Sequence, residues 1–436
     1  MALPPSVANI LALEARSLLT RLNRVKPFAL IVPMVPAAGV SAEAAQAIEH
    51  YLIKGRRELR ARVRGYLDWL RSLAGRGSTP AEAQRRFAFL KLRFNAGLTQ
   101  FDIFAHALTL RGEVDNGVWL AGLDVAAEDA IQLASRFYDP PPVMTYLDRG
   151  QGAAIRRART RLPGGGENPV AVIRIPWERM VGSGLASSLV HEVGHQGAAL
   201  IQLVESLRSA LRARWRRAEG DERLAWQLWE RWISEIVADF WSVAKLGVVA
   251  TQGLMQVVSL PRAFVFRVQP DDPHPFPWIR VRLSTALGSF LYPDPQWELF
   301  GRLWESFYPR TGIGADRLRI LAVLDATMPE FIRLLVHHRP KALQGAALHQ
   351  VFPIAERQPE RLRALYEAWR RDKTLSRTAA PTLVFAVLGQ ARQDRRITPE
   401  QESETVAEIL RYWALKRSLG DLRAAARAPK AIAVAA

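Results

Sequence analysis

The chain has 436 residues, of which 49% are hydrophobic and 23% are charged, and its formal net charge is +18. This composition excludes a mostly disordered protein, and 28 glycines and 27 prolines without a fixed period exclude a collagen-like one. The absence of cysteine excludes a disulfide scaffold, a thiol nucleophile and an iron–sulfur site, so a metal ion would have to be held by histidine, aspartate and glutamate.

The positive charge comes mostly from arginine, since only eight of the 60 basic residues are lysine. The arginines are spread along the chain without a helix-turn-helix, zinc-finger or RNA-binding motif, so we interpret them as solvated helix faces and expect no nucleic acid partner. The sequence has no charged leader and no apolar run of about 20 residues. We therefore expect no transmembrane segment and a cytoplasmic protein by default, with leaderless secretion left open.

The first 140 residues are predicted to be helical. Apolar residues recur at three- and four-residue spacing through Leu11–Leu22, Ala45–Leu73 and Ala81–Leu98. Prolines separate the first two of these segments, and Ser78 or Thr79 is a candidate cap for the third.

Two short β-branched segments follow, Val143–Leu147 and Val170–Ile175, and they predict a small paired sheet. The helical pattern then returns, with one helix expected over Leu185–Arg217 and a second, rich in tryptophan, over Leu224–Leu246. After a proline-rich loop at 270–277 the chain is again helix-rich. The predicted fold class is therefore mainly α with a small β-sheet (α+β).

The first of these two helices carries a histidine pair with metal-ligand spacing. His191 and His195 are four residues apart, so their side chains lie about 40° apart on one helix face and can reach the same ion. Glu192 follows His191 directly, where its carboxylate can touch a water molecule beside the metal. Two polar residues with ordinary partners on a half-buried helix are the alternative interpretation of this motif.

A third ligand is needed, because catalytic zinc usually has three protein ligands. The metzincin pattern fails because Ile201 stands where its third histidine would be, and Glu205 lies about 15 Å further along the helix axis. On the tryptophan-rich helix, Glu235 and Asp239 are four residues apart within an apolar face, where unpaired carboxylates are costly. A divalent cation held by Glu235, and a histidine N–H bonded to Asp239, would compensate them.

This pattern, His-Glu-x-x-His followed by Glu-x-x-x-Asp on a later helix, resembles the gluzincin superfamily of zinc metallopeptidases over about residues 140–290. The resemblance implies a Zn²⁺ cofactor with His191, His195 and Glu235 as ligands, Asp239 as the partner of the first histidine, and Glu192 as the catalytic base. It also implies that Val170–Ile175 is the edge strand on which substrate docks, although an ordinary core strand is an equal alternative. A zincin-like core (141–310) would then be flanked by helical N-terminal (1–140) and C-terminal (311–436) regions.

The group that stabilises the reaction's oxyanion is less clearly indicated. Many gluzincins use a histidine after the ligand helix, which makes His274 a candidate catalytic residue, along with Arg280 or Arg282. Alternatively, Asp272 or His274 only caps a helix, or His274 binds the metal while Glu235 is structural.

The sequence thus predicts a zinc-dependent metallopeptidase that acts on a peptide or protein substrate. The alternative is a non-catalytic, metal-containing binding or assembly protein on a peptidase scaffold. Four arginines near the predicted cleft would either favour acidic substrate segments or be solvated surface charge; they are Arg156, Arg157, Arg159 and Arg161. We also expect the N-terminal helices to shield the cleft in part, and the sequence predicts no particular oligomeric state.

Overall fold

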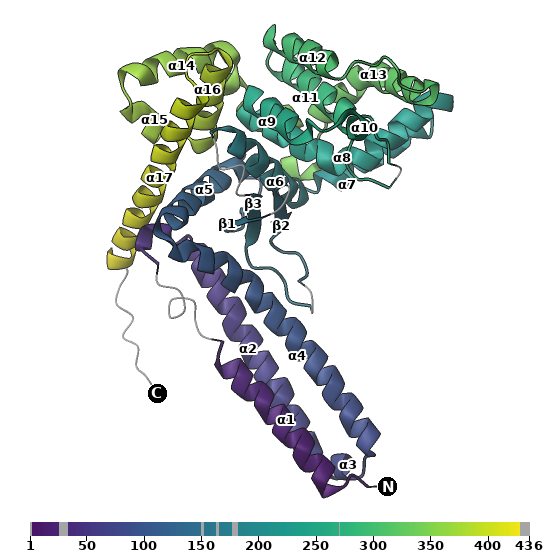
Figure 1. Cartoon of the computed structure of the whole chain (residues 1–436), viewed down its shortest axis with the longest axis vertical. Coiled ribbons are helices and arrows are strands. Elements are labelled where there is room, and N and C mark those ends of the chain that lie inside the picture. Colours follow the sequence, from purple (N-terminus) through teal and green to yellow (C-terminus); the bar gives the residue numbers. More distant parts are fainter. Residues whose placement is uncertain are drawn as a thin grey trace.

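The computed structural model describes residues 2–25, 34–149, 152–162, 165–176, 182–269 and 271–427. Most of these residues are helical and the strands among them form one three-stranded sheet, which confirms the predicted fold class. In Figure 1 a long helical arm projects from a larger helical body, and the sheet lies where the two meet. None of the described helices is long and apolar enough to span a membrane.

The arm is built from the N-terminal helices, which lie side by side along their length (Figure 1): α1 (Pro5–Asn23), α2 (Ala42–Arg71), the one-turn α3 (Leu73–Arg76) and α4 (Pro80–Thr109). The three predicted segments correspond to α1, α2 and α4, and α4 extends well past its predicted end. The hydroxyl of Thr79 accepts a hydrogen bond from the backbone N–H of Glu82, so Thr79 is the cap.

The sheet has the strands β1 (Val143–Asp148), β2 (Ala154–Arg156) and β3 (Ala171–Pro176) in the order β1-β3-β2. β3 pairs in parallel with β1 and antiparallel with β2. The expectation that Val170–Ile175 is an edge strand is therefore wrong, because this segment is the central strand. The two edge strands are β1 and β2, and the three residues of β2 are too few for an alternating pattern to predict.

The predicted helix over Leu185–Arg217 is also wrong in one respect, because it is two helices, α6 (Gly184–Leu200) and α7 (Leu203–Trp215). Between them Gln202 has a φ of 51°, in the left-handed region, which turns the chain. No glycine or proline stands at this break, so the sequence pattern does not reveal it. α8 (Gly220–Leu246) then packs against both helices.

Two glycines inside α6 allow it to lie unusually close to α8. A Cβ atom at Gly194 would come within 3.0 Å of the Cα atom of Ala238, and one at Gly197 within 2.3 Å of the Trp241 ring. These glycines therefore do not break the helix but permit the close approach of the two helices that carry the candidate ligands. The tryptophans of α8 are core residues, as the apolar pattern predicts: Trp226, Trp229, Trp232 and Trp241.

The remaining helices complete the body around α5 (Val114–Ile131) and α8. They are α9 (Val248–Val258), α10 (Arg262–Val265), α11 (Pro277–Leu291), α12 (Gln296–Phe307), α13 (Ala315–Val336), α14 (Pro359–Arg371), α15 (Thr374–Thr378), α16 (Pro381–Gln393) and α17 (Pro399–Arg427). One cluster of buried apolar side chains extends from Trp119 on α5 to Trp413 on α17, without a break at residue 310. A second cluster fills the arm and reaches the sheet at Met144 and Val172. The division into three regions stays a prediction about chain organisation.

A buried ion pair joins the arm to the body. Arg111, which follows α4, is fully buried, and its guanidinium donates to the carboxylate of Asp124 on α5 at 2.9 Å and to the backbone carbonyl of Thr145 on β1 at 2.7 Å. Breaking one partner of such a buried pair leaves an uncompensated charge. The pair therefore fixes the end of the arm, α5 and β1 relative to one another.

Candidate metal centre

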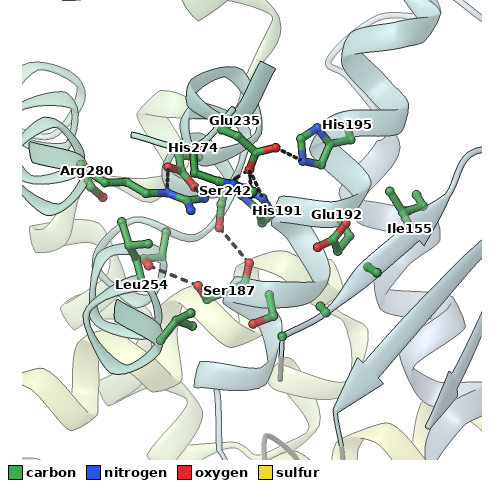
Figure 2. A pocket seen from close by; sticks show the side chains of 18 of the residues that line it. Ile155, Ser187, His191, Glu192, His195, Glu235, Ser242, Leu254, His274 and Arg280 are labelled. Atoms are coloured by element: carbon green, nitrogen blue, oxygen red, sulfur yellow. Dashed lines mark hydrogen bonds and ion pairs between the residues drawn. The ribbon is translucent and has the colours of Figure 1, made fainter. Parts of the chain in front are cut away.

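The two histidines of α6 face the Glu235 carboxylate of α8, as Figure 2 shows. The Nε2 atoms of His191 and His195 each lie 3.4 Å from an oxygen of the Glu235 carboxylate. One donor atom from each of these three side chains lies within 4.8 Å of the other two, so together they could hold a metal ion. The chain thus brings together the three candidate ligands that the sequence predicts, from two separate helices, α6 and α8.

The hydrogen bonds around the donors fit a bound cation. The Nδ1–H group of His191 donates to Asp239 at 2.9 Å, so the Nε2 atom is the one that faces Glu235. An imidazole lone pair and a carboxylate at this distance repel each other unless a proton or a metal ion lies between them. Two histidines and one carboxylate also form a ligand set typical of catalytic zinc.

Arg280 on α11 balances the negative charge of Asp239, the second carboxylate on this face of α8. Its guanidinium donates to both oxygens of Asp239, at 2.7 and 2.8 Å, and lies 3.6 Å from Glu235. Such a forked pair fixes the orientation of Asp239, which in turn orients the His191 ring. Burial alone would raise the pKa of Asp239, but the charge of Arg280 and the hydrogen bond from His191 outweigh it and hold that pKa below its usual range.

The two histidines have opposite pKa shifts. Burial would lower the pKa of His191, but its hydrogen bonds to Asp239 and Glu235 raise it to about 9. Burial and the neighbouring charge of His191 lower the pKa of His195 to about 4. At pH 7 these shifts favour a protonated His191 and a neutral His195 in the metal-free protein.

Metal binding should release the proton that His191 carries, because an imidazole ligand must be neutral. We expect about one proton per Zn²⁺ at pH 7, and an affinity that increases with pH until His191 loses its proton above about pH 9. Calorimetric titration in buffers of different ionisation enthalpy measures the number of protons released. If about zero protons are released at pH 7, the metal does not displace a proton from His191.

His274 lies beside the three donors rather than among them. Its Nε2 atom is 3.3 Å from the Glu235 carboxylate, and its Nδ1 and backbone N–H are both bonded to Asp272, at 2.8 and 2.9 Å. Among the described residues it is not part of the set whose donor atoms lie mutually close. About half of its side chain is exposed, and it lines the cavity beside the three donors.

Glu192 is buried next to the donors and contacts the edge strand. Its carboxylate is bonded to the backbone of Ile155 in β2, and Figure 2 shows it between α6 and that strand. Burial raises its pKa above the usual range, against the opposing charge of His191. A carboxylate with a raised pKa is suited to accept and return protons near neutral pH.

A cavity of about 500 Å³ opens beside these residues. Its walls are β2 with its flanking residues, α6, α8, α9 and α11. The hydroxyls of Ser187 and Ser242 are already bonded to backbone carbonyls, so the part of the cavity near Val243 and Leu254 presents mainly apolar surface. No described residue before Gly152 lines the cavity, so the described part of the arm forms none of its walls, and the expected shielding stays a prediction.

Two other residues that the sequence analysis considered for the site, Glu205 and Arg282, do not line the cavity. Glu205 forms an exposed pair with Arg208 on α7, and Arg282 pairs with Glu305 and Asp325 away from the cavity. The role of Arg280 as the partner of Asp239 was not evident from the pattern. The sequence does indicate that a further cation is needed. Two carboxylates on an apolar helix face require more positive charge than two histidines supply.

Comparison with protein-family models, curated protein sequences and solved structures returns no match to this chain. The resemblance to gluzincins stays a prediction from the motif residues.

Proposed function

We propose that the protein is a zinc-dependent metallopeptidase that hydrolyses peptide bonds in peptide or protein substrates. The observation that carries this proposal is the convergence of His191, His195 and Glu235 from two helices beside a cavity that also contains Glu192. When bound, zinc would supply a Lewis acid that lowers the pKa of a water molecule and polarises the scissile carbonyl.

In this proposal Glu192 acts as the general base. It takes a proton from the attacking water and returns it to the leaving amine, so that the same carboxyl group serves both halves of the reaction. Burial supports this role, because it raises the pKa of Glu192 towards neutrality. The bond to Ile155 holds the carboxylate between α6 and the strand on which an extended substrate would lie.

His274 is the proposed donor to the oxyanion that forms during hydrolysis. Asp272 binds its Nδ1 atom and its backbone N–H, which fixes the ring with Nε2 towards the cavity. Because the Nδ1–H group donates to Asp272, the donor at Nε2 is the N–H that the ring carries as an imidazolium, and a positioned donor of this kind stabilises negative charge that develops on the carbonyl oxygen. Arg280 is less suited to this role because both of its charged hydrogen bonds go to Asp239.

β2 is the proposed docking strand. It pairs on one side with β3 and lies at the edge of the sheet next to the cavity. An extended peptide can add to such an edge through backbone hydrogen bonds, which aligns its carbonyl groups with the site.

Chelation tests the proposal. The purified full chain is expected to contain about one zinc per molecule and to cleave members of a denatured-protein or peptide library. Activity should disappear after dialysis against a chelator and return when one equivalent of Zn²⁺ is added. A metal-loaded protein that cleaves no library member would instead support the non-catalytic binding protein.

A further inference from the structure

A second hollow, called the outer groove below, borders the metal cavity across β2. Its volume is about 580 Å³, and its lining comes from the sheet, from the residues after β2 and from the base of α4. Ala154, Ile155 and Arg157 line both hollows. A peptide lying along β2 would therefore reach the metal cavity and the outer groove at the same time.

The outer groove is positively charged. Arg156, Arg157 and Arg174 line it, and within the described chain no aspartate or glutamate does. Arg174 has a carboxylate 3.8 Å away, that of Asp148, whereas no ion pair of Arg156 or Arg157 is found among the described residues. Two of the three guanidinium groups are thus available to an anionic ligand.

The register of the sheet determines which side chains face the outer groove. Ala154 lies opposite Arg174 and Arg156 opposite Val172, whereas Ile155 lies opposite Ile173. Because successive side chains of a strand point to opposite faces, Arg156 shares the outer face with Arg174. An extended substrate paired with β2 alternates in the same way, so every second side chain would enter the outer groove.

The backbone that carries these arginines is tied to the candidate metal centre. The buried side-chain amide of Asn168 donates to the carbonyls of Arg156 and Arg157, at 3.1 and 2.9 Å. The next residue, Ala158, donates its N–H to Gln196 on α6 at 2.8 Å. The two arginines therefore start from a backbone that is fixed relative to the helix bearing His191, and little ordering is needed when a ligand binds.

We propose that the outer groove binds carboxylate side chains of the substrate. The protein should then prefer peptides with aspartate or glutamate at positions that alternate with those facing the metal cavity. This inference rests on the proposed peptidase function, since it assumes an extended substrate on β2. A peptide fits the observations better than a nucleic acid because the groove adjoins a strand edge, which pairs with peptide backbone.

The test uses the full chain and a proteome-derived peptide library. Cleaved bonds should have aspartate or glutamate enriched at one or more flanking positions. For a matched pair of peptides with glutamate or glutamine at that position, kcat/KM should be about five-fold higher for glutamate at low salt, and the difference should shrink as salt increases. The double variant Arg156→Glu with Arg157→Glu should abolish or invert this preference for glutamate. The double variant Arg156→Lys with Arg157→Lys should keep it.

Arg62→Glu with Arg93→Glu is the matched control, because it makes the same charge change on α2 and α4 of the arm. This variant should leave the ratio unchanged. Cleavage without any acidic preference would overturn the inference and leave the peptidase proposal standing.

If no peptide is cleaved, the preference for acidic side chains is tested by binding. The matched glutamate and glutamine peptides are labelled with fluorescein for this measurement. The zinc-loaded protein should bind the glutamate peptide about five-fold more tightly than the glutamine peptide at low salt. Equal binding, or tighter binding of a single-stranded oligonucleotide of the same length, would overturn the inference.

Discussion

Glu192→Gln should leave zinc bound and lower kcat by about 10²- to 10⁴-fold, the range that general acid–base catalysis contributes. Glutamine keeps the size of the side chain and an oxygen that can accept the bond from Ile155, but it cannot take a proton. The three proposed ligands are untouched by the substitution, so metal content should stay at about one zinc per chain. Steady-state cleavage of a fluorogenic peptide, together with zinc analysis of the same sample, measures both quantities.

The thermal unfolding temperature of Glu192→Gln provides the control. It should be equal to or slightly above that of the natural chain, because the substitution removes a buried charge from the site. Unchanged kcat with full zinc occupancy would contradict the role assigned to Glu192. A loss of zinc together with activity would show that this carboxylate helps to hold the metal.

Glu235→Gln should abolish stable zinc binding. The amide oxygen is neutral and a much weaker ligand than the carboxylate, and only His191 and His195 remain in the donor set. Substitutions next to zinc ligands already weaken metal affinity by about 10- to 100-fold, so loss of a direct ligand should weaken it by at least about 100-fold. Zinc content after dialysis against metal-free buffer should fall to near zero, and peptide cleavage should fall with it.

Glu205→Gln is the matched control for this substitution. Glu205 is exposed on α7 and pairs with Arg208. Its position in the sequence places it too far along the helix to share a metal ion with His191 and His195. Its zinc content and activity should equal those of the natural chain. A Glu235→Gln protein that retains one tightly bound zinc would contradict the assignment of Glu235 and favour His274 as the third ligand.

The features that sequence predicts well here are local ones. The four-residue spacing of His191 and His195 fixes their common helix face, and the apolar pattern of α8 places Glu235 and Asp239 on one side of it. The meeting of the two helices depends on contacts far apart in the chain, and sequence indicates it only through two buried carboxylates that need a positive partner. Gly194 and Gly197, which read as weak points in a helix, are in fact where α8 packs closely.

The features that sequence does not predict depend on tertiary contacts. β2 is a strand because three residues pair with β3, and neither their number nor their type marks them as one. The turn at Gln202 places a non-glycine residue in the left-handed region without a local signal. Arg280 acquires its role because α11 brings it to Asp239 across 41 residues of chain.

Anomalous diffraction at the zinc absorption edge, from crystals of the zinc-loaded Glu192→Gln protein, tests the central claim most directly. The account predicts one strong peak about 2.0–2.2 Å from the Nε2 atoms of His191 and His195 and from a carboxylate oxygen of Glu235. A site that remains without a peak at full zinc loading, or a peak whose ligands exclude Glu235, would contradict it.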